Sequence, residues 1–341
     1  MGMLENGVWT QRGYDMRKTG GAFVRSETAF RRWITADGSS GFRAEPGRYH
    51  LFVSLACPWA SRVVIVRKLK KLQDAISMST VYWGDEGWFG AGGDSFPETV
   101  KGSIRLHQVY TAAQPSYTGR VTVPVLWDHK QRTIVNNDSA EILRMLNGEF
   151  DAFGDPTVDF YPEQLRPEID RLNAFVYENV NDGVYRAGFA TSQWAYEEAF
   201  ERLFAALDEL EARLARSRYL VGDRITEADW RLFTTLVRFD LVYYAHFKCN
   251  RRRLVDYGNL WAYTRDLYQV HGVAETVDLG HIKRHYYVSQ DWINPTRIVP
   301  KGPEIDFAAP HGRDRTYPAP QSVLCERRTD DRRHRNRKRH P

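Results

Sequence analysis

Cys57 is the residue whose type and setting point most directly to chemistry. It lies in LFVSLACPWAS, between an apolar run that predicts a strand and a proline that opens a helix. Unpaired backbone N–H groups and the dipole at a helix start stabilise an anion. We therefore expect a lowered pKa and a nucleophilic thiolate at Cys57, rather than a thiol that only packs as an apolar side chain.

The spacing around Cys57 limits the thiol chemistry that is open to it. A CxxC motif would place its second cysteine where this sequence has Ala60. Cys57 therefore needs an external partner, and we predict mixed-disulfide exchange with a small thiol. The histidines show no ligand spacing such as HExxH, and no Gly-rich nucleotide fingerprint follows a strand. We expect no metal and no nucleotide cofactor.

Two residue pairs further along the chain are candidates for binding that small thiol. Val123-Pro124 lies in an apolar run where proline cannot donate to a ladder. The pair is either part of an edge strand or a cis peptide that turns backbone groups toward a peptide-like ligand. Asp138-Ser139 opens a helix, where Asp138 can cap the first turn. The same pair can also hold the α-amino and α-carboxylate groups of a ligand.

The elements that carry these residues follow an α/β pattern. Pro58 begins a predicted helix that runs to about Leu72, and a second helix is predicted over Ser139–Leu146. Segment 84–119 is Gly-rich and polar, which predicts an insertion or an active-site loop. Strands are predicted over Tyr49–Ser54, Ala75–Trp83, Val121–Trp127 and Thr133–Asn136.

The second half of the chain has helical periodicity. Apolar residues recur at spacings of three and four in two series, and Thr226-Glu-Ala-Asp229 reads as a capping box. The series are Ala199, Leu203, Leu207, Leu210, Leu214 and Leu232, Leu236, Phe239, Tyr243. We expect an irregular leader (1–46), a βαβ–ββα domain (47–147), a linker (148–164), an all-helical domain with an extended C-terminal segment (165–320) and a basic disordered tail (321–341).

Composition narrows the class of protein. Of 341 residues, 42% are hydrophobic and 27% are charged, as in an ordinary globular protein. The net charge of +5 invites a nucleic-acid interpretation, but residues 326–341 alone hold eight Lys/Arg and three Asp/Glu. The remainder is neutral, with 40 charges of each sign, so nucleic-acid contact is expected only from the tail, if at all.

The cellular setting is also constrained. Three cysteines make no disulfide framework and fit the reducing cytoplasm. No apolar run reaches the length of about 18 residues that a membrane helix needs, and the first residues lack a secretory signal. We expect a cytoplasmic protein with no membrane partner.

The chain resembles the glutathionyl-hydroquinone reductases, the Xi class of the glutathione transferase superfamily. The resemblance covers about residues 10–305 in order, and CPWA, NDGVY and TEADWRLFTTLVRFD are its most specific parts. Other matching segments are DEGWF, RVTVPVLWD, IVNNDSAEI, HFKCN, HIKRHYY and INPTRIVPKGP. It implies an N-terminal thioredoxin-like domain, a C-terminal helical domain and a homodimer.

The resemblance also implies a role for individual residues. Cys57 would be the nucleophile and Tyr185 would act in proton transfer, while Tyr243 and Tyr286 would hydrogen-bond the aromatic substrate or stabilise the thiolate. Trp88 would pack over glutathione, Val123 would pair its backbone with the glutathione cysteine, and Asp138 and Ser139 would hold its γ-glutamyl end. The implied thiol-binding set is Trp88, Arg120, Val121, Thr122, Val123, Pro124, Asp138 and Ser139.

Three positions depart from the family pattern and leave the thiol open. Asp138 stands where Glu is usual, which makes the γ-glutamyl contact one methylene shorter, and Ser61 and Gln290 each stand where His is common. The co-substrate is glutathione or a related thiol such as mycothiol.

The leading hypothesis is thiol-dependent reduction of S-glutathionyl-hydroquinones through a mixed disulfide on Cys57. One alternative is an Omega-like thiol transferase or dehydroascorbate reductase, which shares Cys57 but does not need the three tyrosines. Another is a non-catalytic ligand-binding protein whose basic tail contacts nucleic acid.

Overall fold

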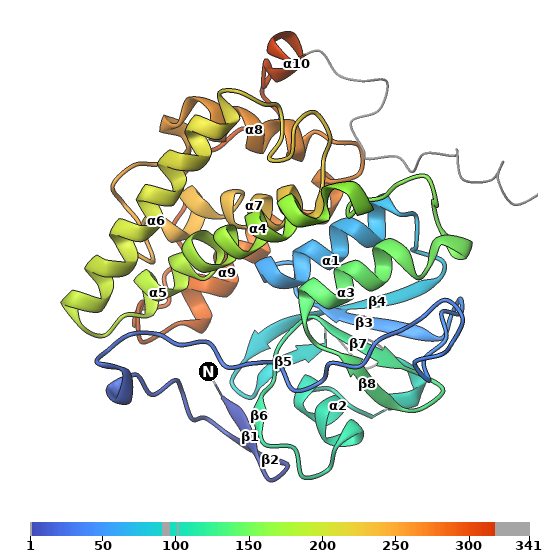
Figure 1. Ribbon diagram of the computed structural model, residues 1–341. Coiled ribbons are helices and arrows are strands. Elements are labelled where there is room, and N and C mark those ends of the chain that lie inside the picture. The colour runs from blue at the N-terminus through green and yellow to red at the C-terminus, as the bar shows by residue number, and fades with distance from the viewer. Residues whose placement is uncertain (1, 91–95, 101, 318–341) are drawn as a thin grey trace, which may run out of the picture.

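A five-stranded sheet forms the centre of the N-terminal half (Figure 1). The computed structural model describes residues 2–90, 96–100 and 102–317, so the predicted basic tail 321–341 lies outside the described residues. The strand order is β5-β4-β3-β7-β8, and only β3 and β4 run parallel. The bounds are β3 (Tyr49–Val53), β4 (Ile76–Gly84), β5 (Gly87–Gly90), β7 (Val125–Asp128) and β8 (Thr133–Asn136).

Helices cover both faces of this sheet. On one face lie α1 (Pro58–Leu69) and α3 (Ser139–Gly148), and on the other lies α2 (Leu106–Ala113) (Figure 1). Because β3 is covered on both faces, all five of its side chains are buried and its sequence is almost continuously apolar. This strand leads directly into the start of α1.

The C-terminal half is helical, and it packs against the first half through α1. Helix α1 contacts α7, and a single hydrophobic core continues from the sheet into the helices. The expected combination of an α/β domain and an all-α domain is confirmed. The helices are α4 (Arg166–Val176), α5 (Gly183–Phe189), α6 (Gln193–Leu214), α7 (Glu227–Leu236), α8 (Gly258–Tyr268), α9 (Leu279–Ser289) and α10 (Arg313–Thr316).

Local sequence signals explain where several of these helices begin. Pro58 is the first residue of α1, where its missing N–H would have no partner. Asp138 caps α3 by accepting from the N–H groups of Ala140 and Glu141. Thr226 and Asp229 form the predicted capping box of α7.

Two wide π-helical turns interrupt the helical half. They span Tyr177–Asn181 and Phe239–Tyr243. In each, the hydrogen bond runs to a residue five positions earlier, from Asp182 N to Tyr177 O (2.9 Å) and from Tyr244 N to Phe239 O (2.8 Å). The apolar series predicted as one helix through Tyr243 therefore leaves α-helical geometry after Leu236.

The leader is not wholly irregular, contrary to the prediction. Strands β1 (Met3–Glu5) and β2 (Val8–Thr10) pair with each other, and β1 also pairs with β6 (Gly119–Arg120). Three-residue strands are too short to show the alternation that identifies a strand in a sequence. The rest of the leader forms hydrogen bonds with both halves of the protein. Gly21 O accepts from Thr191 N in the helical half (2.9 Å), and Arg32 N donates to Val135 O in the sheet (3.0 Å).

Two further expectations differ from the structure. Segment 84–119 is not one loop, because it contains β5 and α2. The strand predicted over Val121–Trp127 does not form as one piece, because β6 ends at Arg120 and β7 begins at Val125. Proline lies in the gap between them, where it interrupts no ladder. No helix within the described residues is long and apolar enough to cross a membrane.

Candidate active site

Cys57 lies where β3 meets α1, as the N-cap residue of that helix. Its thiol donates toward the carbonyl oxygen of Val123, with 3.6 Å between Sγ and O. The Val123-Pro124 peptide is cis, so of the two interpretations of this pair the edge strand is wrong. Cys57 and the cis Val123-Pro124 peptide, far apart in the sequence, are therefore neighbours in the fold.

The pKa of the Cys57 thiol is raised, which corrects the prediction of a lowered value. Burial is the largest cause, because it disfavours the thiolate. The helix start acts in the predicted direction, since the N–H groups of Ala60 and Trp59 lower the pKa, as do the charges of Arg238 and Arg25. Together these effects are smaller than desolvation. The sequence showed the helix start but not the depth at which the thiol lies.

Three tyrosines from three elements form a hydrogen-bonded chain near the thiol. Tyr286 on α9 lies in the middle, with its hydroxyl 2.5 Å from that of Tyr185 on α5 and 3.0 Å from that of Tyr243. Burial raises the pKa of all three phenols, so each keeps its proton at neutral pH. The chain can therefore supply a proton and donate hydrogen bonds.

A cavity of about 140 Å³ joins the thiol to these tyrosines. Cys57, Tyr185 and Tyr286 line it, whereas Tyr243 is fully buried and does not. Tyr243 therefore reaches the cavity through Tyr286. Trp88 forms part of the wall, with its ring stacked on that of His285 at 5.0 Å between centroids. The cavity thus has an aromatic lining suited to a flat ring beside a sulfur nucleophile.

A larger cavity of about 600 Å³ lies beside the first and shares part of its lining. Asp138 and Ser139, at the start of α3, lie in its wall together with Pro124. The Asp138 cap uses one carboxylate oxygen, Oδ1. The residues that line both cavities are Tyr14, Arg25, Trp59, Arg120, Thr122 and Val123.

Buried arginines give the larger cavity a positive wall. Arg62 is 2% exposed and Arg231 is 8% exposed. Burial, together with repulsion from Arg231, lowers the pKa of Arg62 to about 9. Nε of Arg62, Nε of Arg231 and Nη2 of Arg25 are buried without a hydrogen-bond partner. Since a buried, unsatisfied donor costs about 1–3 kcal/mol, an anionic ligand here would be stabilised.

Known proteins match the chain over nearly its whole length. The family models described as "Glutathione S-transferase, N-terminal domain" and "Glutathione S-transferase, C-terminal domain" match residues 56–149 and 193–266. Glutathionyl-hydroquinone reductase YqjG of Escherichia coli is 53% identical, over 92% of this chain and 99% of the relative. Glutathionyl-hydroquinone reductase PcpF of Sphingobium chlorophenolicum is 55% identical, over 89% and 96%.

Solved structures agree. The Xi-class glutathione transferase of Natrialba magadii is 49% identical and superposes with a TM-score of 0.85, over 92% of this chain and 97% of that one. This chain belongs to the Xi class of glutathione transferases. The glutathione-bound structure of YqjG is 50% identical, with a TM-score of 0.83 over 92% and 99% of the two chains.

The structure of this Xi-class chain brings most of the predicted site residues to one place. Eight line the smaller cavity: Cys57, Trp88, Arg120, Val121, Thr122, Val123, Tyr185 and Tyr286. Pro124, Asp138 and Ser139 line the larger one. The guanidinium of Arg120 bonds the leader, donating to the carbonyl oxygens of Arg12 (2.6 Å) and Gly2 (3.2 Å).

The positions that depart from the Xi pattern also have partners. Ser61 donates to the carbonyl oxygen of Cys57 (3.0 Å) and accepts from Arg238 (2.6 Å). Gln290 lines the smaller cavity and bonds His246, with 2.9 Å between Oε1 and Nε2. Neither substitution leaves its site without a polar side chain.

Arg25, Arg62, Arg231 and His285 also belong to this site, although they were not predicted from the sequence. Arg231 and His285 lie in segments that carried the family resemblance, but no spacing rule separates them from surface residues. Arg25 comes from the leader, where its guanidinium lies 4.7 Å from the Trp59 ring and 4.8 Å from that of Tyr185. Only the tertiary fold brings these side chains together.

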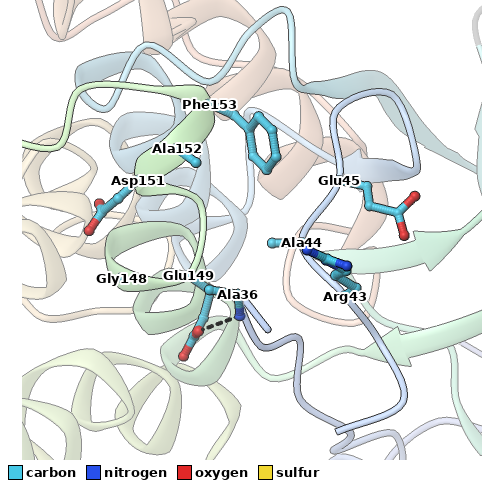
Figure 2. A pocket seen from close by; sticks show the side chains of 9 residues that line it. All are labelled: Ala36, Arg43, Ala44, Glu45, Gly148, Glu149, Asp151, Ala152 and Phe153. Carbon is cyan, nitrogen blue, oxygen red and sulfur yellow. Dashed lines mark hydrogen bonds between the residues drawn. The ribbon is translucent and has the colours of Figure 1, made fainter. Parts of the chain in front are cut away.

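A second cavity of about 600 Å³ lies away from the thiol, where α3 ends at Gly148 (Figure 2). Its wall includes Phe153, and its carboxylates already have partners. Glu149 accepts from Ala36 N (2.9 Å), and Asp151 pairs with Lys70 at the end of α1. Its lining contains no cysteine, histidine or tyrosine.

Proposed function

We propose that this protein reduces S-glutathionyl-hydroquinones to hydroquinones with glutathione as reductant. The observation that carries the proposal is that Cys57, Tyr185 and Tyr286 line one aromatic cavity, which opens into a cationic cavity containing Asp138 and Ser139. The relatives named glutathionyl-hydroquinone reductase support the same activity.

The first step transfers the glutathionyl group to the enzyme. The Cys57 thiolate attacks the sulfur of the substrate, forming the S–S bond of a Cys57–glutathione mixed disulfide and breaking the bond from sulfur to the ring carbon. The electron pair of that bond stays with the ring carbon, which takes a proton as the hydroquinone leaves. Tyr185 is the donor, because its phenol is protonated and lines the cavity.

Tyr286 stabilises this transfer. Its hydroxyl lies within hydrogen-bond distance of Tyr185 and Tyr243, so the tyrosine chain can share the negative charge left on Tyr185. The same hydroxyl is close enough to the cavity to bond a ring oxygen of the hydroquinone.

The second step regenerates the thiolate. A glutathione thiolate attacks the mixed disulfide, releases oxidised glutathione and restores Cys57. Overall, one glutathionyl-hydroquinone and one glutathione give one hydroquinone and one oxidised glutathione. Because a covalent intermediate separates two half-reactions, we expect ping-pong kinetics.

The cationic cavity favours glutathione over mycothiol as the reductant. Glutathione carries two carboxylates, whereas mycothiol carries none. Arg25, Arg62 and Arg231 line this cavity, and each has a buried N–H group without a partner that could bond a carboxylate. A neutral sugar would leave the buried charge of Arg62, which has no carboxylate within ion-pair distance among the described residues, uncompensated.

The test is turnover of glutathionyl-menadiol by wild type, C57S and the matched control C249S. Cys249 is buried and lines neither cavity, so C249S should keep its activity. C57S should lose about a thousandfold or more, and only proteins that retain Cys57 should carry a glutathione adduct by mass spectrometry. A fully active, adduct-free C57S would end the proposal, and faster turnover of dehydroascorbate would favour the thiol-transferase alternative.

We also propose that the protein works as a homodimer in the cytoplasm, as the family resemblance implies. Light scattering coupled to size exclusion tests the dimer. A monomeric mass at micromolar concentration would contradict it.

A further inference from the structure

Arg238 is a buried cation that takes no part in the two proposed reaction steps. It follows α7 and is 1% exposed. Its guanidinium crosses to the N-terminal domain and donates to the carbonyl oxygens of Leu55 (2.8 Å) and Ala56 (2.9 Å). These are the two residues immediately before Cys57.

The remaining donors of Arg238 complete a clamp. Nη2 also donates to Ser61 Oγ (2.6 Å), and Nη1 donates to the carbonyl oxygen of Thr234 (2.6 Å) on α7. Ser61 in turn donates to the carbonyl oxygen of Cys57. The helical domain thus holds the backbone on both sides of the cysteine through one side chain.

The acceptors in this clamp are all neutral. Within residues 2–90, 96–100 and 102–317, no carboxylate lies within ion-pair distance of Arg238. A buried charge without an opposite charge is costly, so the position would be stabilised by an anion nearby. The Arg238 charge acts on three groups that can become anions, the Cys57 thiol and the phenols of Tyr243 and Tyr286, and it lowers the pKa of each against the effect of burial. Of these three, only Cys57 directly follows the two residues whose carbonyl oxygens Arg238 holds.

We propose that Arg238 is a positioning residue for Cys57: it fixes the loop that carries the thiol and supplies the positive charge against which the thiol ionises. The inference rests on Cys57 being the nucleophile of the proposed function. Arg238 immediately precedes the π-helical turn that ends at Tyr243. One short segment therefore positions both the loop that carries the nucleophile and Tyr243 at one end of the tyrosine chain.

Other charged or titratable groups also surround the thiol, so their effects must be held constant. They come from the leader, from α1, from α5 and the second π-helical turn, and from α9. They are Tyr14, Arg25, Arg62, Tyr185, Tyr243, His281, His285 and Tyr286, together with Arg120 from β6. None of them forms a hydrogen bond with the backbone of Leu55 or Ala56. Their effect on the pKa of Cys57 is therefore independent of the loop contacts that Arg238 makes.

The test measures the pKa of Cys57 without any substrate. The rate of Cys57 alkylation by iodoacetamide is followed from pH 6 to 10, and the labelled peptide is identified by mass spectrometry. The background is C325S, which removes a competing cysteine that lies outside the described residues. R238M and R238Q remove the charge, R238K keeps it without the planar fork, and S61A removes one clamp acceptor while keeping the charge. Thermal melts verify that each variant is folded.

We expect R238M and R238Q to raise the pKa of Cys57 by about one unit, which is a tenfold loss of thiolate below the pKa. R238K and S61A should shift it by less than half as much. R238K should nevertheless lower kcat about tenfold with an unchanged KM for glutathione, because the loop loses its two carbonyl contacts while Asp138 and Ser139 are untouched.

If R238M or R238Q is folded and its pH dependence of Cys57 alkylation matches that of wild type, the proposed electrostatic effect of Arg238 on the thiol is overturned. If neither neutral variant folds, R238K decides, because a wild-type kcat in that variant would overturn the positioning part. The alkylation readout needs no substrate. A failure of this inference is therefore distinguishable from a failure of the proposed reductase activity, which C57S tests separately.

Discussion

Two cavities of about 600 Å³ lie at opposite ends of α3, and they differ in the state of their polar groups. In the cavity next to Cys57, buried N–H groups of Arg25, Arg62 and Arg231 have no hydrogen-bond partner. In the cavity of Figure 2, Glu149 and Asp151 are already bonded to the protein. Equal volume therefore does not make an equal site. Buried groups that lack a partner mark the cavity built for a ligand.

The largest effect is expected at Tyr185, which lines the smaller cavity adjoining the cationic one. Y185F removes the phenolic proton while the ring remains, so hydroquinone release should slow about a hundredfold and the second thiol exchange by much less. Rapid-quench measurement of each half-reaction checks this. Y243F is the matched control, with a smaller effect because Tyr243 does not line the cavity. Equal slowing of both half-reactions would reject proton transfer by Tyr185.

The next effect tests the cationic wall directly. R62M removes a buried charge-assisted donor, worth about 1.5–3 kcal/mol, so the KM for glutathione should rise about tenfold or more. The matched control is R43M, because exposed Arg43 lines the cavity of Figure 2. Steady-state kinetics with glutathione as the varied substrate decide. If the two variants had the same KM for glutathione, the conclusion that only the cavity next to Cys57 binds this ligand would be wrong.

An effect of about the same size for each pH unit is expected from thiol ionisation. Burial raises the pKa of Cys57, so the thiolate fraction and kcat/KM for the glutathionyl substrate should rise about tenfold per pH unit until the pH passes that raised pKa. The phenols should cause no opposing fall below pH 9.5, because their pKa values are also raised. A pH–rate profile from 6 to 9.5 measures this. A flat profile would show that thiol ionisation is not limiting.

The smallest effect is expected in the cavity of Figure 2. E149Q weakens the bonds from Ala36 N and Trp33 Nε1 to the carboxylate, at a cost of about 1 kcal/mol. The melting temperature should fall by about 2 °C, and turnover should stay within twofold of wild type. Calorimetry and the glutathionyl-menadiol assay check both. A large loss of turnover would show that this cavity takes part in catalysis after all.

The residues that the sequence could identify are those with a local signal. Cys57 stands before a helix-opening proline, Asp138 stands at an N-cap, and Pro124 interrupts an apolar run. Such signals depend on neighbours in the chain, which is why the start of α1 and of α3 could be predicted. Helix α2 also left a signal, since Leu106, Val109 and Tyr110 are buried at spacings of three and four. The Gly-rich surroundings concealed it.

The arginines could not be found in this way. The roles of Arg25, Arg62, Arg231 and Arg238 follow from burial, and burial arises only when the leader, α1 and α7 pack together. The same reason explains the wrong prediction for the pKa of Cys57, because a helix start is local whereas desolvation depends on the whole fold.

The relative positions of the side chains in the site depend on the number of residues in the two π-helical turns. Each turn holds one residue more than an α-helical turn. The first ends at Asn181, which accepts from Arg62, and is followed by Asp182, which accepts from Arg25. The second ends at Tyr243. Deleting one residue from either turn would restore the α-helical repeat and rotate everything after it by about 100°. Tyr185 or Tyr243 would then leave the tyrosine chain. A one-residue deletion in these turns should therefore be more damaging than most substitutions there, although every side chain of the site would still be present.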